Sequence, residues 1–166
     1  MKKSCLFIFF LLLLGACKDA ASERSYLQET GWAVEVSKLP KKSSINAKAL
    51  AILKNWKAYN AFEASFDKLY QAEFREDFVL IIEELVENQK LLEASNYPQQ
   101  FDIPQIRSRQ KVLKSYILKI KGNLEYRQHP ETAIKEMIGA FNNLRQHFNI
   151  VVNSNLPEDL FSNEKN

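Results

Sequence analysis

The sequence predicts an all-α protein: an antiparallel, up-down-up-down four-helix bundle over residues 44–156, preceded by a signal peptide and a flexible tether. The chain has neither glycine nor proline between Pro40 and Pro98, and segments so poor in helix breakers favour helix. Apolar residues recur every three or four positions, and no segment alternates every second position as a strand does. Helices joined by short loops pack as a bundle.

The first residues form a targeting segment. Lys2 and Lys3 precede an uncharged run over residues 4–16 that is rich in Leu, Phe and Ile and ends in small residues. A helix needs about 20 apolar residues to cross a bilayer, and this run is shorter. The basic start, apolar middle and small end are typical of a secretory signal. We therefore expect residues 1–16 to be a cleaved signal peptide.

The end of this segment, Leu14-Gly15-Ala16-Cys17, resembles the lipobox of bacterial lipoproteins. The resemblance implies cleavage before Cys17 and attachment of fatty acyl chains, such as palmitate, to this cysteine. The protein would then be a lipid-anchored component of the bacterial cell envelope. Lys18 follows where Asp would signal inner-membrane retention, which favours the outer membrane, facing the periplasm or the cell surface. The alternative is an ordinary cleaved signal that leaves Cys17 as a free thiol.

The charge balance gives no signal for nucleic acid, and we expect no nucleic-acid partner. Removal of residues 1–16 leaves 21 basic and 20 acidic side chains, so the mature chain is nearly neutral. Cys5 lies in the cleaved segment, so we expect no disulfide, and stability has to come from packing.

Residues 17–43 are predicted to be the lipidated N-terminus and a tether, because apolar residues are sparse and Pro40 interrupts the segment. The alternation of Trp32, Val34 and Val36 leaves open a short extended piece that docks on the domain.

Local chemistry predicts where the first two helices begin. Ser43 or Ser44 can cap the first helix. Acidic residues near positions 72–77 suit the start of a second helix, because the helix dipole favours negative charge there. The apolar pattern continues almost in phase through this point, so one long bent helix over residues 44–94 is the alternative.

The third and fourth helices have proline at their starts. Pro98 ends the second helix, Pro104 suits the first turn of the third, and Pro130 precedes the fourth. We expect residues 157–166 to be a C-terminal tail. The predicted core stripes are Ile52, Trp56, Tyr59, Phe62, Phe66 and Leu69; Phe74, Phe78, Ile81, Leu85 and Leu92; Ile103, Ile106, Leu113, Ile117, Ile120 and Leu124; and Ile134, Met137, Phe141, Leu144, Phe148 and Val151.

Charge predicts one helix adjacency. Residues 63–93 carry a net charge of −6 and residues 102–127 one of +5. Packed as antiparallel neighbours, the second and third helices would face each other with complementary signs.

No motif for catalysis, for a metal or for a cofactor is present. The sequence lacks a nucleophile elbow, a glycine-rich phosphate loop and an H-E-x-x-H motif. A di-iron bundle needs Glu-x-x-His, and neither His129 nor His147 has a Glu three residues before it. We therefore predict a non-enzyme.

Two constellations are candidate binding sites. Arg107 and Arg109, with Lys111 and Lys114, begin the third helix and can hold an anion there, or else pair with the acidic second helix.

The second candidate is a polar layer across the bundle, predicted from helix register. Asn88, Gln110 or Arg109, and His147 or Phe148 fall at one level, together with Asn60 or Tyr59. Such a layer either fixes the helix register or lines a small-ligand site.

These observations predict a non-catalytic helical binding or scaffold module for an envelope protein partner, of unknown oligomeric state. The alternative is a bundle that senses a small ligand in its core. The first function requires exposed apolar surface, and the second requires a polar cavity near Asn88.

Overall fold

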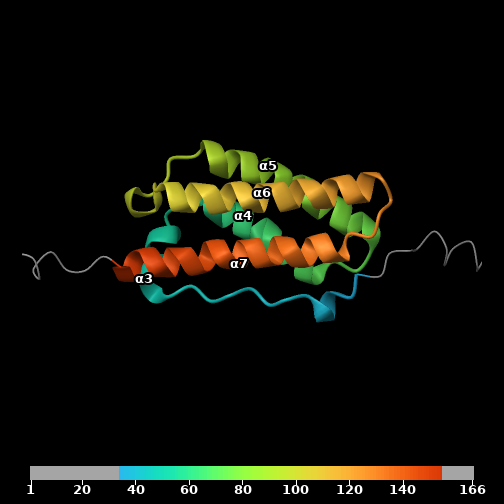
Figure 1. Ribbon diagram of the computed structural model, residues 1–166, viewed down its shortest axis with the longest axis horizontal. Coiled ribbons are helices and arrows are strands. Elements are labelled where there is room, and N and C mark those ends of the chain that lie inside the picture. The colour runs from blue at the N-terminus through green and yellow to red at the C-terminus, as the bar shows by residue number, and fades with distance from the viewer. Residues whose placement is uncertain (1–33, 155–166) are drawn as a thin grey trace, which may run out of the picture. The chain divides into compact units, whose positions relative to one another are not determined.

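A computed structural model describes residues 34–154, and all the regular secondary structure in this part of the chain is helical, which confirms the all-α prediction there (Figure 1). The predicted signal peptide, Cys17 and the C-terminal tail lie outside the described residues. The α-helices are α3 (Ala47–Leu53), α4 (Lys57–Lys68), α5 (Arg75–Ala94), α6 (Pro104–Glu125) and α7 (Glu131–Ser154). Short 3-10 helices are η2 (Val36–Lys38), η3 (Leu69–Gln71) and η4 (Gln99–Phe101).

The four long helices lie side by side, and consecutive ones run in opposite directions (Figure 1). α4 packs on α5, α5 on α6 and α6 on α7, while the short α3 packs on α7. Aromatic rings join α4 to α7. The ring centroids of Phe66 and Phe141 are 4.2 Å apart, and those of Tyr59 and Phe148 are 5.4 Å apart. Each such ring, fully buried, contributes about 1.5–3 kcal/mol.

The predicted core stripes are buried with few exceptions. Phe74 is the clear error, because its side chain is 63% exposed. It is the residue that precedes the first turn of α5, in extended backbone, so it is not part of the inner face of that helix.

Several helix starts agree with the prediction. α5 is separate from α4, and the carboxylate of Asp77 accepts hydrogen bonds from the backbone N–H groups of Phe74 and Glu73 at 2.9 and 3.0 Å. These bonds lower the pKa of Asp77, because they stabilise its charged form. Pro104 is the first residue of α6, and α7 begins directly after Pro130.

The predicted first helix is instead two helices, and this corrects both its start and its continuity. Asn46, rather than Ser43 or Ser44, caps α3 by accepting from the backbone N–H of Ala49 at 2.8 Å. The helix then breaks between Leu53 and Lys57, without glycine or proline. The side chain of Asn60 donates to the freed carbonyl of Lys54 at 2.9 Å, which replaces the lost helical donor.

The chain before α3 also differs from the prediction of a tether that reaches residue 43. Residues 39–46, here called the strap, run along α7. Two asparagine side chains on α7, Asn142 and Asn149, donate to and accept from the strap backbone at 2.7–3.0 Å. Because these amides satisfy backbone groups that would otherwise need water, a segment of low apolar density is fixed.

Candidate functional site

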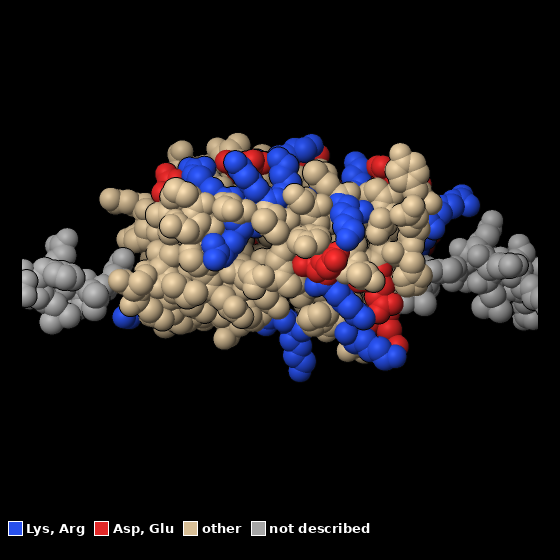
Figure 2. All heavy atoms as spheres, in the orientation of Figure 1, with Lys and Arg blue, Asp and Glu red and all other residues tan. Residues whose placement is uncertain are grey.

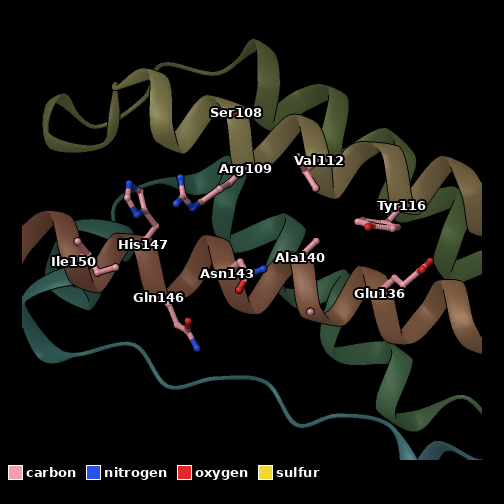
Figure 3. A pocket seen from close by; sticks show the side chains of 11 residues that line it. Ser108, Arg109, Val112, Tyr116, Glu136, Ala140, Asn143, Gln146, His147 and Ile150 are labelled. Atoms are coloured by element: carbon pink, nitrogen blue, oxygen red, sulfur yellow. The ribbon is translucent and has the colours of Figure 1, made fainter.

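A groove of about 690 Å³ runs between α6 and α7, and it is the candidate binding site (Figure 3). It is partly open to the surface. Its lining residues are Ser108, Arg109, Val112 and Tyr116 from α6, and Glu136, Gly139, Ala140, Asn143, Gln146, His147 and Ile150 from α7. These α7 positions recur at spacings of three and four, so they form one face of the helix about 21 Å long.

The middle of the groove is lined by small residues. A side chain at Gly139 would meet no heavy atom within 4 Å, so space is open above this residue. Ala140 lies beside it, and Val112 and Ile150 expose their apolar side chains along the groove. A second backbone can therefore approach α7 closely here.

One end of the groove is basic. The side chains of Arg109 and His147 lie toward each other between the two helices (Figure 3). Burial, and secondarily the charge of Arg109, lowers the pKa of His147, which favours the neutral imidazole. Its Nδ1 is buried and has no partner among the described residues. At the other end, Glu136 pairs with Lys119 of α6 at 2.6 Å.

The exposed face of α7 is otherwise uncharged. After Glu136 the only charged residue of this helix is Arg145, and Arg145 is buried. Figure 2 shows the contrast: Lys and Arg side chains gather over α6, while the C-terminal half of α7 shows few charges. Depletion of charge is typical of the centre of a protein interface.

Of the residues predicted to form a polar layer, Gln110 is buried, but the residue of α5 that contacts it is Gln89 and not Asn88. Gln89 and Gln110 are 1% and 2% exposed, and Gln89 Nε2 donates to the backbone carbonyl of Gln110 at 3.5 Å. The hydroxyl of Tyr97 donates to Gln110 Oε1. Asn88, the residue before Gln89, is half-buried on the side of α5 that faces α4. Its Nδ2 donates to Ser65 Oγ on α4 at 2.6 Å.

The buried polar residue of α5 is Gln89 and not the predicted Asn88 because the buried face of this helix is wider than expected. Both Ile81 and Ile82 are buried, as are Leu85 and Val86, because α5 is covered by α4 on one side and α6 on the other. Because α5 is covered on two sides, its buried face is wide enough to include Gln89. The sequence prediction assumed one narrow stripe of apolar residues, and Asn88 lies on that stripe.

The basic residues that begin α6 do not converge on one site. Arg107 donates from Nε and Nη2 to Asp102 Oδ1 at 2.8 and 2.6 Å, and its guanidinium lies 4.0 Å from the Tyr97 ring centroid. Arg109 lines the groove instead. Lys114 pairs with Glu93 of α5 at 2.5 Å, and among the described residues this is the one ion pair that joins α5 to α6. The predicted anion site at Arg107 and Arg109 is therefore divided.

A partly buried charge network, which the sequence did not suggest, lies on the opposite side of α7. Arg145 Nε donates to the Ser43 carbonyl at 2.7 Å, and its Nη1 contacts the Tyr59 hydroxyl at 3.2 Å and the Glu63 carboxylate. Lys42 of the strap bonds Glu63 at 3.0 Å. Burial raises the pKa of Tyr59, and the Glu63 charge adds to this effect. The only sequence signal was an arginine between two core positions of α7, Phe141 and Phe148.

No protein-family model, curated protein or solved structure matches this chain. Within residues 34–154, no helix is long and apolar enough to span a bilayer, and no three side chains of the metal-binding types gather as a cation site.

Proposed function

We propose that this protein is a lipoprotein of the bacterial cell envelope, anchored through acyl chains on Cys17, whose helical domain is a non-catalytic binding module for an envelope protein. In this proposal α4 to α7 form an up-down-up-down four-helix bundle, and the α6–α7 groove receives a helix of the partner. The lipobox-like sequence at residues 14–17 supports the anchor, and its Lys18 supports the outer membrane.

The groove supports the binding function, because it combines an open site at Gly139 with an uncharged exposed face on α7. Its length of about 21 Å corresponds to four helical turns. Helix-in-groove recognition uses apolar positions at this spacing, and Val112 and Ile150 supply exposed apolar contacts. The exposed groove favours a protein partner over a ligand enclosed in the core near Asn88.

Photo-crosslinking in intact cells tests the groove. A photoreactive side chain at Gln146 in the groove should crosslink to one protein, whereas one at Leu80, exposed on α5, should not. Gly139→Leu fills the open space and should weaken the Gln146 crosslink about tenfold or more, the effect of about 1.4 kcal/mol.

Gly122→Leu is the matched control. Gly122 is also in a helix, also has open space where a side chain would begin, and lies outside the groove. An equal loss of crosslink in both glycine variants, or a crosslink at Leu80 alone, would contradict the groove as the binding surface.

Intact mass measurement of the membrane-extracted protein tests the anchor. The expected mass begins at Cys17 and includes acyl chains, and a Cys17→Ala form should lack them. A mature chain without acyl groups would overturn the proposed localisation.

One observation favours a second candidate, a small anionic ligand at the basic end of the groove. There the buried Nδ1 of His147 lies unpaired near Arg109. Native mass spectrometry of the extracted protein would show a retained molecule, and Arg109→Gln should release it.

A further inference from the structure

Two large aromatic side chains are exposed at one end of the domain. Phe74, just before α5, is 63% exposed, and Tyr126, just after α6, is 78% exposed. Large exposed aromatic side chains can bury apolar surface against another surface that meets them.

Both residues lie at the end where the described chain begins, here called the entry end. Arg75 Nη2 donates to the Leu124 carbonyl at 2.7 Å, which joins the start of α5 to the end of α6. At the same end, η2 packs against η3, just before Phe74. Figure 1 shows η2 at the end of the domain where α6 connects to α7.

The number of residues between Cys17 and Val34 does not determine which face of the domain lies toward the membrane. Sixteen residues lie between Cys17 and Val34, and extended they reach about 55 Å at most. The longest helix, α7, has 24 residues and spans about 36 Å. An anchored domain could therefore present any face to the bilayer, and contacts of its surface decide which.

Apolar contact, rather than charge, is what the entry end offers to a bilayer. Glu73, Glu76, Asp77 and Glu125 are near the two aromatic residues, and they outnumber Arg75 and Arg127, so charge does not draw this end to an anionic surface. A phenylalanine and a tyrosine bury apolar surface at the boundary between headgroups and acyl chains, where the tyrosine hydroxyl stays hydrated.

We propose that Phe74 and Tyr126 insert into the phospholipid leaflet that holds the acyl chains of Cys17, so that the entry end sits on the membrane. This inference rests on the lipidation of Cys17. The bundle axis then points away from the bilayer, and the α6–α7 groove opens sideways, accessible to a protein in the envelope.

Site-specific fluorescence on the lipidated full chain tests the orientation. Because acylation occupies Cys17, a single introduced cysteine can be labelled with an environment-sensitive dye. The protein is reconstituted into vesicles of phosphatidylethanolamine and phosphatidylglycerol, and into phosphatidylcholine vesicles. Tyr126→Cys is expected to show a blue-shifted emission in both. Leu91→Cys, also exposed but near the far end of α5, should show none.

The outcomes distinguish a failure of the proposed orientation from a failure of the lipid anchor at Cys17. Phe74→Ser should reduce the Tyr126→Cys shift, because it removes the other side chain proposed to insert at the same end. Co-flotation with vesicles but identical emission at both labels overturns the proposed orientation and leaves the anchor intact. A shift seen only in native envelopes, and not in protein-free vesicles, overturns the lipid contact and assigns the entry end to a protein. Failure to float with vesicles overturns both the anchor and this inference.

Discussion

Arg145 is a buried charged residue with three contacts. Its guanidinium bonds the strap at Ser43 and α4 at Tyr59 and Glu63. A buried ion pair is weak evidence for stability, but removal of one partner is costly, because the other is left in a site of low dielectric.

We therefore expect Arg145→Met to lower the free energy of unfolding by about 2–3 kcal/mol, measured by urea denaturation of the Cys17→Ser mature chain. Lys111→Met, which replaces an exposed lysine on α6, should change it by less than about 0.5 kcal/mol. Equal stability of the two variants would show that Lys42 alone satisfies Glu63.

His147 should make stability depend on pH. Burial and Arg109 lower its pKa in the folded chain below the ordinary value of 6.5, so the unfolded chain takes up this proton first as the pH falls. Stability is then fully present above about pH 6.5 and decreases below it.

His147→Gln should flatten the dependence of the urea midpoint on pH between about 6.5 and 5.5, above the range in which most carboxylates titrate. Arg109→Gln should flatten it partly, because one of the two causes remains. His129→Gln, which alters an exposed histidine in the α6–α7 connection, is the control. A slope that survives in His147→Gln contradicts the assignment.

At the scale of the elements, local chemistry predicted some helix boundaries and tertiary contacts set the others. Proline at positions 104 and 130 and the carboxylate of Asp77 act within one helical turn, so the sequence reveals them. The break before Trp56 does not have such a signal. Trp56 donates to Ser95 Oγ at 2.8 Å and lies 4.7 Å from the ring of Tyr97, contacts across 39 and 41 positions that periodicity cannot anticipate.

The strap is the element whose order depends most on another element. Because Asn142 Nδ2 donates to the Lys41 carbonyl and Asn142 Oδ1 accepts from the Ser43 N–H, one side chain holds two strap residues. Each such bond contributes about 1 kcal/mol.

Asn142→Ala should raise amide hydrogen exchange in residues 39–46 while leaving the exchange of α4 to α7 almost unchanged, because the strap opens locally. Asn143→Ala removes the neighbouring side chain, which faces the groove, and should leave the strap protected. Equal exchange of the strap in both variants would mean that Arg145 and Asn149 suffice to hold it.

At the scale of the whole molecule, α7 separates two surfaces of different character. One side carries the strap, where buried Arg145 meets partly exposed Glu63. The other side lines the groove, where no charge interrupts the exposed face between Glu136 and the end of the helix. The sequence predicted the apolar side of α7 but assigned residues up to 43 to a tether, because the polar groups that hold the strap lie about 100 positions away.

This arrangement predicts where the stable domain begins. A mature chain that starts at residue 34 keeps every contact of the strap, so its urea midpoint should equal that of a chain that starts at residue 18. A chain that starts at residue 47 loses Lys42, the carbonyl of Ser43 and the Asn46 cap of α3, while Glu63 and Arg145 remain. The loss of these contacts should cost about 2–4 kcal/mol. If the domain instead begins at the predicted boundary near residue 44, the chain from residue 47 would lose only the helix cap, about 1 kcal/mol.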